Sequence, residues 1–184
     1  MNNAFFFFVF LFYVCQADAQ RADDRRVKAI QDNVRHILLS EDYHQAPVVE
    51  FNGCAEGGEA KVFSSQQYVE RVVATCYGET GKSTAEYFFQ RGKISFVSEK
   101  ETLYNRPIYY DSAMAASNNE LEFFDEARST VTETRSYFHN GKLFRQEIVE
   151  NGKEIVVGFI PPAEQKRILA DLEKILRMKK KRPG

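Results

Sequence analysis

This sequence of 184 residues has few of the side chains that usually bind metals: three histidines and three cysteines. The histidines, at positions 36, 44 and 139, form no His-x-x-x-His pair and no spacing with cysteine that is typical of a metal site. The serine-hydrolase pattern Gly-x-Ser-x-Gly is also missing. We therefore predict no metal site and no cofactor, and the absences favour a protein without catalytic activity.

Long hydrophobic runs are scarce as well. The longest, residues 4–15, has about a dozen apolar positions, which is too short for a membrane span and suits the core of a signal peptide. Ala17-Asp18-Ala19 places small residues where a signal peptidase reads them. We therefore predict cleavage before Gln20, an exported protein that is periplasmic or secreted, and no integral membrane segment after cleavage. Lipidation at Cys15 is the alternative, but Phe12-Tyr13-Val14 lacks the small residues of a lipoprotein signal.

An excess of positive charge is the third absence. The chain has 25 Lys and Arg against 26 Asp and Glu. Removing residues 1–19 takes away one acidic residue, Asp18, so that 25 of each sign remain. Domains that bind nucleic acids generally present clustered positive charge. We therefore predict no nucleic-acid partner.

Two cysteines remain after the predicted cleavage, Cys54 and Cys76. In an oxidising compartment two cysteines favour one disulfide. A bridge that closes a loop of about 22 residues stabilises a protein by about 3 kcal/mol. The alternative is a pair of buried free thiols.

Helical periodicity marks the two ends of the mature chain. Apolar residues at helical spacing predict one helix over residues 24–39, which Asp23 or Asp24 can cap. A second apolar stripe predicts a helix over residues 162–179, beginning at Pro162. Residues 179–184 form a basic tail, for which solvation is the simplest interpretation.

Between the helices the period becomes alternating. Strands rich in Val, Phe, Tyr and Thr are predicted at residues 59–63, 68–77, 83–90, 93–104, 129–139, 142–150 and 154–159, and a short one at 48–51. Most connections are too short for a parallel crossover, so the sheet should be an antiparallel meander.

Two hairpin turns repeat one pattern, aromatic-x-x-Gly-Lys-aliphatic, around Arg91-Gly92 and Asn140-Gly141, and Asn151-Gly152 gives a third turn. With a two-residue loop at Arg91-Gly92, Phe89 should face Ile94 and Tyr87 should face Phe96, giving one apolar side of the ribbon.

One string, Gly78-Glu79-Thr80-Gly81-Lys82-Ser83-Thr84, looks like a phosphate-binding loop. That loop needs a first glycine five residues before Gly81, where Cys76 stands, and it must open a helix. Because a strand follows here, we interpret residues 78–81 as a hairpin turn.

The segment 105–126 is the longest connection within the predicted sheet. Connections of this length are often functional, and we predict Tyr104, Arg106, Tyr109 and Tyr110 as residues that bind a ligand or partner. The alternative is a surface excursion or short helix that packs Ile108 and Phe123 on the edge of the sheet.

The motif Gly-Glu-Thr-Gly-Lys, followed by Tyr-Phe-Phe-x-x-Gly-Lys-Ile and later by Tyr-Phe-x-Asn-Gly-Lys-Leu, resembles small exported bacterial proteins of uncharacterised function. These proteins carry repeated aromatic-x-x-Gly-Lys-aliphatic hairpins. The resemblance covers residues 57–152, and it implies hairpins and export but no catalytic residue.

The sequence therefore predicts a cleaved signal peptide, residues 1–19, followed by one α+β domain, residues 20–184. In that domain an antiparallel meander of about six to seven strands (residues 59–159), curved or partly barrel-like, packs against the N-terminal and C-terminal helices. The favoured function is a non-catalytic exported module that binds a protein or a small apolar ligand. The alternative is an enzyme with a carboxylate or tyrosine site near residues 105–126.

Overall fold

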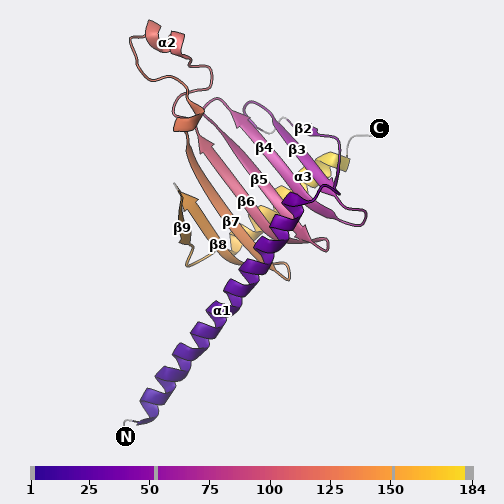
Figure 1. Ribbon diagram of the computed structural model, residues 1–184, viewed down its shortest axis with the longest axis vertical. Coiled ribbons are helices and arrows are strands. Elements are labelled where there is room, and N and C mark those ends of the chain that lie inside the picture. Colours follow the sequence, from indigo (N-terminus) through magenta and orange to yellow (C-terminus); the bar gives the residue numbers. More distant parts are fainter. Residues whose placement is uncertain (1–2, 52–53, 151, 181–184) are drawn as a thin grey trace. The chain divides into compact units, whose positions relative to one another are not determined.

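The computed structural model describes residues 3–51, 54–150 and 152–180. The chain divides into two compact units, residues 1–39 and 40–184. Its elements are α1 (Asn3–Leu39), β1 (His44–Gln45), β2 (Val49–Phe51), β3 (Gly58–Ser64), β4 (Val69–Gly78), β5 (Gly81–Gln90), β6 (Lys93–Leu103), α2 (Ser112–Ser117), the 3₁₀ turn η1 (Glu126–Arg128), β7 (Thr130–His139), β8 (Lys142–Glu150), β9 (Lys153–Val156) and α3 (Pro162–Lys180) (Figure 1).

The first unit is the single helix α1, which contains the predicted helix 24–39 and also covers most of the predicted signal peptide. Asp23 lies inside this helix and pairs with Arg26 at 2.8 Å, so it does not cap the helix start. Cleavage before Gln20 and packing of the N-terminal helix on the sheet remain predictions. Of the helices that the structure describes, none is long and apolar enough to cross a membrane.

The second unit is built on one antiparallel sheet, in which the described residues form nine strands. From β3 to β9 each strand pairs with the one before it in the chain, so the predicted meander is confirmed. All seven of its predicted strands are present, but the last, β9, ends at Val156 and not at residue 159. β2 matches the predicted short strand, and β1 was not predicted. Both pair with β3 at one edge while β9 forms the other, so the sheet stays open.

The repeated turn motif gives two hairpins of the same geometry. Arg91 and Gly92 have φ angles of 52° and 74°, and Asn140 and Gly141 have 50° and 75°. Positive φ at both loop residues is the requirement of a type I′ turn, whose twist matches that of the flanking strands. Gly152 has the same sign of φ, 77°, whereas Asn151 lies outside the described residues, as do residues 52–53 and the end of the basic tail, residues 181–184.

The predicted register of the first of these hairpins is half right. Phe89 does face Ile94, but Tyr87 faces Val97 and not Phe96. The register shifts by one residue beside Phe89. A shift of one residue moves a side chain to the other face of the sheet, because side chains alternate along a strand.

A β-bulge explains the shift. Ser95 is the extra residue of β6, and its hydroxyl donates a hydrogen bond to the Phe88 carbonyl at 3.2 Å. The bulge puts Phe96 opposite Phe88, on the face away from Tyr87. The β7–β8 hairpin has a register shift at the corresponding place, between Tyr137 and Phe138. The repeated motif thus encodes a turn and also a bulge.

The hydrophobic core of this unit lies between α3 and one face of the sheet (Figure 1). Ile168 and Leu172 of α3 are 0% and 7% exposed and pack on the sheet. The predicted packing of the C-terminal helix is confirmed. The buried members of this core are Val62, Val72, Tyr87, Phe89, Val97, Phe138, Ile168 and Leu172.

The opposite face of the sheet carries a separate row of aromatic rings. The row runs across β5, β6 and β7. The ring centroids of Phe88 and Phe96 are 5.8 Å apart, and those of Phe96 and Tyr137 are 5.0 Å apart. Arg71 lies over the Phe88 ring at 5.6 Å and pairs with Glu86. The two faces therefore differ, since only the first is packed against α3.

Candidate functional site

A cleft of about 490 Å³ opens between α3 and the sheet, beside the core. Its volume lies in the range of about 300–1,000 Å³ that is usual for small-molecule sites. We call it the α3 cleft. Its lining residues are Cys54, Ala74, Cys76, Ser83, Thr84, Ala85, Tyr87, Glu99, Lys100, Glu101, Thr132, Thr134, Glu164, Arg167, Asp171, Lys174, Ile175 and Met178.

Small side chains on the sheet explain why the cleft is open. Ala74 pairs with Ala85, and the next row toward the strand ends is Cys76 and Ser83. The row on the core side instead carries Val72 opposite Tyr87. Replacing large side chains by methyl and hydroxyl groups leaves space between the helix and the strands.

Polar residues of α3 recur every three or four positions and form the other wall. Glu164, Arg167, Asp171 and Lys174 all line the cleft. Residues three and four apart lie on one face of a helix. The stripe of α3 that borders its buried stripe is therefore charged.

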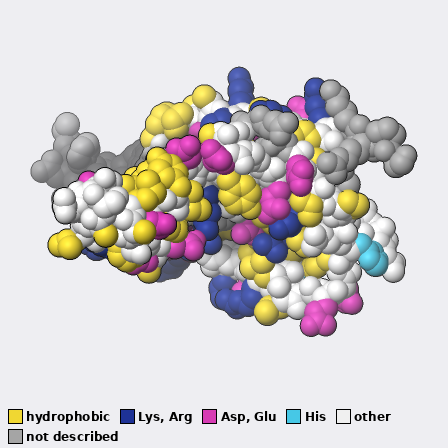
Figure 2. Space-filling model, turned by 90° about the horizontal axis from the view of Figure 1, so that it is seen from above, with side chains coloured by type: hydrophobic (Ala, Val, Ile, Leu, Met, Phe, Trp, Pro, Cys, Tyr) yellow, Lys and Arg dark blue, Asp and Glu magenta, His cyan; other side chains and the backbone are white. Residues whose placement is uncertain are grey.

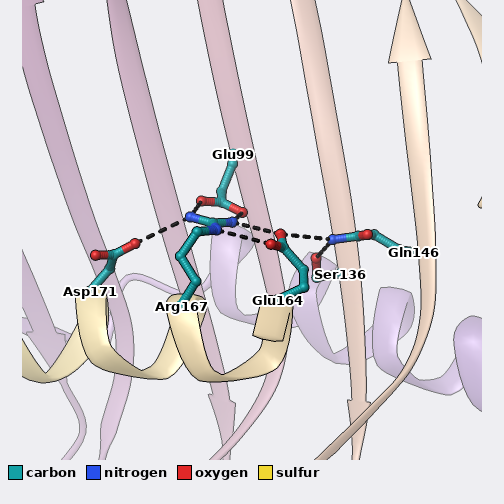
Figure 3. A network of polar contacts seen from close by, with 6 residues as sticks. All are labelled: Glu99, Ser136, Gln146, Glu164, Arg167 and Asp171. Carbon is teal, nitrogen blue, oxygen red and sulfur yellow. Dashed lines mark hydrogen bonds and ion pairs between the residues drawn. The ribbon is translucent and has the colours of Figure 1, made fainter. Parts of the chain in front are cut away.

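Arg167 is the centre of a polar network between the helix and the sheet (Figure 3). Two of its guanidinium nitrogens donate to the two carboxylate oxygens of Glu99 in β6, at 2.9 and 2.7 Å. The same guanidinium donates to Glu164 at 2.8 and 3.1 Å and to Asp171 at 3.2 Å. A bidentate arginine–carboxylate pair fixes direction as well as distance, so this network sets the position of α3 over the cleft.

The network continues into the sheet through Glu164. The Gln146 side chain donates to Glu164 at 3.4 Å and to the Ser136 hydroxyl at 3.0 Å (Figure 3). Ser136 and Gln146 are both buried. Buried polar groups that are satisfied in this way make a position specific, and here they fix the first turn of α3 above β7 and β8.

The network also changes the acidity of its members. The hydrogen bond from Arg167 lowers the pKa of the Glu164 carboxyl below its ordinary value of 4.5. The hydrogen bonds to Glu164 and Glu99 raise the pKa of Arg167. Both shifts have the sign that stabilises the charged forms, so the network is an ion cluster at neutral pH.

Tyr87 lies at the inner end of the cleft, where the cleft meets the core. It is 1% exposed, and burial raises the pKa of its hydroxyl, as do the negative charges of Glu99 and Asp171. No described residue forms a hydrogen bond with this hydroxyl. Among the described residues only the Ser129 hydroxyl is a fully buried side-chain polar atom without a partner, so the Tyr87 oxygen is not sealed in the core and can meet a molecule in the cleft that it lines.

The Cys54–Cys76 disulfide borders the cleft at the end of β4. The predicted bridge is therefore confirmed, and its two cysteines have a sequence separation of 22. Cys54 precedes β3 and Cys76 lies within β4, so the bond ties the connection before the sheet to the ladder of strands.

The four tyrosine and arginine residues predicted to bind a ligand lie elsewhere, in the connection between β6 and β7. We call residues 104–129 the β6–β7 excursion. Arg106 pairs with Glu120 at 2.9 Å and lies over the Tyr110 ring at 5.4 Å. Tyr104 packs edge to face on Phe124, with ring centroids 5.2 Å apart.

Tyr109 differs from these residues because it is exposed. The Tyr110 hydroxyl donates to Glu120 at 3.0 Å and accepts from the Asn118 amide at 2.9 Å. The structure thus brings together Arg106 and Tyr110, which hold the excursion in shape, and leaves Tyr109 on its surface.

Further contacts close the base of the excursion. The Asn105 side chain donates to the Phe123 carbonyl at 2.9 Å and accepts from the Asp125 backbone amide at 3.0 Å. The backbone amide of Ile108 donates to the Glu79 carbonyl in the β4–β5 turn at 2.9 Å. The excursion therefore has a defined conformation, anchored to the sheet at one end.

Large hydrophobic side chains are exposed along the excursion. Ile108 does not pack on the sheet edge, since it is 55% exposed, and Leu121 is 96% exposed. Figure 2, a view from above, shows hydrophobic side chains beside acidic ones over this segment. The exposed set in and next to the excursion is Leu103, Ile108, Tyr109, Met114, Leu121, Phe123 and Val131.

His139, one of the three histidines, lies at the β7–β8 turn beside the Asn140 side chain and the Phe144 ring. Within the described ranges, no group of three or more His, Cys, Asp and Glu side chains is placed to hold a metal ion. The predicted phosphate-loop look-alike is a hairpin turn, as expected, because Gly78 pairs with Gly81 and β5 follows.

The sequence reasoning missed the α3 cleft. Its helical half has a recognisable signal, the spacing of Glu164, Arg167 and Asp171 on one helix face. Its other half depends on Glu99, 68 residues away from Arg167. A comparison with models of known protein families, with curated proteins and with solved structures finds no match to this chain.

Proposed function

We propose that this chain is a non-catalytic exported binding module that holds a protein partner through the β6–β7 excursion. Export is supported by the predicted signal peptide and by the Cys54–Cys76 disulfide, a bond typical of oxidising compartments. The observation that carries the proposal is the gathering of exposed hydrophobic side chains on one ordered segment.

The concentration of these side chains is high. Of 14 exposed large hydrophobic residues in the described chain, five belong to the excursion and two more, Leu103 and Val131, lie in the strands beside it. Single exposed hydrophobic residues are ordinary, whereas a patch of them marks an interaction site. Because Arg106, Glu120 and Tyr110 already hold the segment in shape, little conformational entropy is lost when a partner binds.

Charge indicates the chemistry of the partner. The excursion contains five acidic and two basic residues. Its acidic residues are Asp111, Glu120, Glu122, Asp125 and Glu126, and its basic residues are Arg106 and Arg128. Complementary charge favours association and disfavours wrong partners. The partner should therefore present an apolar surface edged by lysine and arginine.

An enzyme with a tyrosine or carboxylate site in this segment remains the alternative function. Tyr110 and Glu120 are in contact, as such a site would require. However, the Glu120 carboxylate is paired with Arg106, and the Tyr110 hydroxyl accepts a hydrogen bond from Asn118. Groups bonded in this way form a structural network. We therefore favour binding over catalysis.

Site-specific photocrosslinking tests the proposal. A photoreactive phenylalanine analogue is placed at Tyr109 or Leu121 in the exported protein, with the exposed turn residue Gln67 as the control position. We expect the analogue at Tyr109 and the analogue at Leu121 to crosslink to the same protein, at an apolar surface edged with Lys or Arg. The analogue at Gln67 should not crosslink to that protein. Leu121→Asp should abolish the adduct without changing the melting temperature.

Equal adducts from Gln67, or none from the excursion, would rule out this docking surface. Adducts that join only a second copy of the chain would replace the proposal by self-association. Each result concerns the excursion alone, because none of the three positions lines the α3 cleft.

A further inference from the structure

The α3 cleft has polar groups that its own network does not use. Among its charged lining residues, Glu99, Glu164, Arg167 and Asp171 are bonded to one another. Lys100 belongs to the other face of the sheet, since it is paired with Glu133 across β6 and β7 and its charge acts on that carboxyl.

Two charged groups remain, one on each wall. Glu101 lies on the sheet, opposite Thr132, and Lys174 lies on α3, one turn beyond Asp171. Across the described chain, neither is in an ion pair. Both side chains are exposed, so each can be reached by a ligand. Because the two walls carry one accessible charge of each sign, a ligand with both charges would pair with both of them, whereas a singly charged ligand would pair with only one.

Tyr87 is the third unused group, and it is nearly fully buried. Its hydroxyl can donate a hydrogen bond to a ligand. Beside this hydroxyl the carboxylates of Glu99 and Asp171 are already bonded to the Arg167 guanidinium, so a further anion there would meet two carboxylates and a cation that is already in use. The acceptor that suits the inner end of the cleft is therefore neutral, as a carbonyl oxygen is.

Between these groups the sheet presents small side chains. Ala74 and Ala85 offer methyl groups, and Ser83, Thr132 and Thr134 offer hydroxyls that make no hydrogen bond within the described part of the chain. A ligand with a narrow body, small apolar substituents and polar groups along its length fits such a wall. A short peptide in an extended conformation has this form.

We propose that the α3 cleft binds a short peptide with free termini, whose ammonium group pairs with Glu101, whose carboxylate pairs with Lys174 and whose backbone carbonyl accepts a hydrogen bond from Tyr87. This site is separate from the β6–β7 excursion and goes beyond the function proposed there. The Arg167–Glu99 pair already fixes α3 over the sheet, so the site does not need to fold around the peptide.

Isothermal titration calorimetry of the full chain tests the proposal, with alanyl-alanine as the probe. N-acetyl-alanyl-alanine lacks the ammonium group, and alanyl-alanine amide lacks the carboxylate. We expect the unblocked dipeptide to bind and each blocked analogue to bind about tenfold more weakly, which is the loss that one charge-assisted hydrogen bond gives. Maltose, an uncharged molecule rich in hydroxyls, is the chemical control and should not bind.

Three variants assign the contacts. Lys174→Gln should weaken the binding of alanyl-alanine about tenfold but leave the binding of its amide unchanged. Glu101→Gln should likewise weaken the binding of alanyl-alanine about tenfold but leave the binding of N-acetyl-alanyl-alanine unchanged. Tyr87→Phe removes one hydroxyl, keeps the buried ring, and should weaken all three peptides. Matched controls outside the cleft are Lys166→Gln on α3 and Glu79→Gln in the β4–β5 turn, both exposed.

Several results would overturn the proposal. The first is no binding of alanyl-alanine at millimolar concentration by protein whose melting temperature is normal. Equal binding of the blocked and unblocked peptides would show that the termini are not recognised. Equal effects of Lys166→Gln and Lys174→Gln would place the peptide outside the cleft, and binding of maltose in place of the peptide would change the ligand class.

Discussion

The β6–β7 excursion and the α3 cleft differ in the distance along the chain over which their residues are held together. Within the excursion many side-chain partners are near neighbours, such as Tyr110 and Glu120, which are 10 residues apart. Its ties to distant parts of the chain lie at its base, where Glu126 pairs with Lys82 at 2.9 Å and the Ile108 amide donates to the Glu79 carbonyl. In the cleft Arg167 holds Glu99 over 68 residues. The excursion can therefore loosen on its own, whereas the cleft exists only when helix and sheet are both folded.

The two regions also differ in how far their apolar side chains are buried. The wall of the cleft continues directly into the hydrophobic core through Tyr87 and Ile175. The apolar residues of the excursion, such as Leu121, are largely in contact with solvent. Substitutions should then act on the unfolding free energy in one region and on binding alone in the other.

The largest effect should come from the core beneath the cleft. Ile168→Ala removes a side chain that is 0% exposed, and it should lower the unfolding free energy by about 2–5 kcal/mol, because lost burial and a cavity add. Leu121→Ala is the control and should change it by less than about 0.5 kcal/mol. Urea unfolding followed by circular dichroism measures both. Equal losses would erase the contrast between the two regions.

The second effect concerns the ion network. Arg167→Met leaves Glu99, Glu164 and Asp171 as three carboxylates without their shared cation, and should cost about 1–2 kcal/mol, since the guanidinium is partly exposed. Arg177→Met, which removes a single exposed pair with Glu173, should cost about 0.3–0.5 kcal/mol. Denaturant unfolding at low salt compares them. A loss no greater than that of the control would mean that α3 is held by its apolar stripe alone.

Acid should weaken the same network. Because the pKa of Glu164 is lowered by folding, the folded protein binds fewer protons at this group than the unfolded chain does. Its contribution is present above the ordinary pKa of 4.5 and is lost as pH falls from there through the lowered value.

Unfolding free energies between pH 3 and pH 7 measure this contribution. The decline on acidification should be shallower in Glu164→Gln than in the unaltered chain. Some decline should remain, because the hydrogen bond from Lys61 also lowers the pKa of Glu59. An identical decline in both proteins would show that Arg167 does not hold the Glu164 charge.

The smallest global effect should come from the excursion. Arg106→Gln removes the pair with Glu120 and the contact over Tyr110. We expect a loss below about 0.5 kcal/mol in unfolding free energy, because the pair is partly exposed. Hydrogen exchange of the amides between Tyr110 and Glu120 should nevertheless become faster, while that of β6 and β7 stays unchanged. Faster exchange in the strands would mean that the excursion supports the sheet.

Local patterns made most of the sheet predictable. The strands follow alternation, and Arg91-Gly92 and Asn140-Gly141 follow the residue preference of their turn. The disulfide followed from cysteine count and compartment. These features depend on neighbours in the chain or on composition, which a single sequence displays.

The misplaced features depend on packing. The bulge at Ser95 shifts the register by one residue, and turn chemistry alone does not specify it, so Phe96 was assigned to the wrong face. The cleft was missed because its Glu99–Arg167 pair joins segments far apart in sequence. Of the four residues predicted to bind, Tyr109 is the one whose side chain is exposed. Arg106 is instead engaged in an ion pair with Glu120 inside the excursion.

The neighbour-to-neighbour order of the strands has a consequence for synthesis. From β3 onward each strand finds its partner in the segment made just before it, so the sheet can extend hairpin by hairpin as the chain elongates. α3 is translated after all of these strands. Until Ile168 and Leu172 arrive, Tyr87 and Val97 lie on an uncovered face. The nascent sheet is then at its most prone to aggregate, and this is the interval in which a chaperone would protect it.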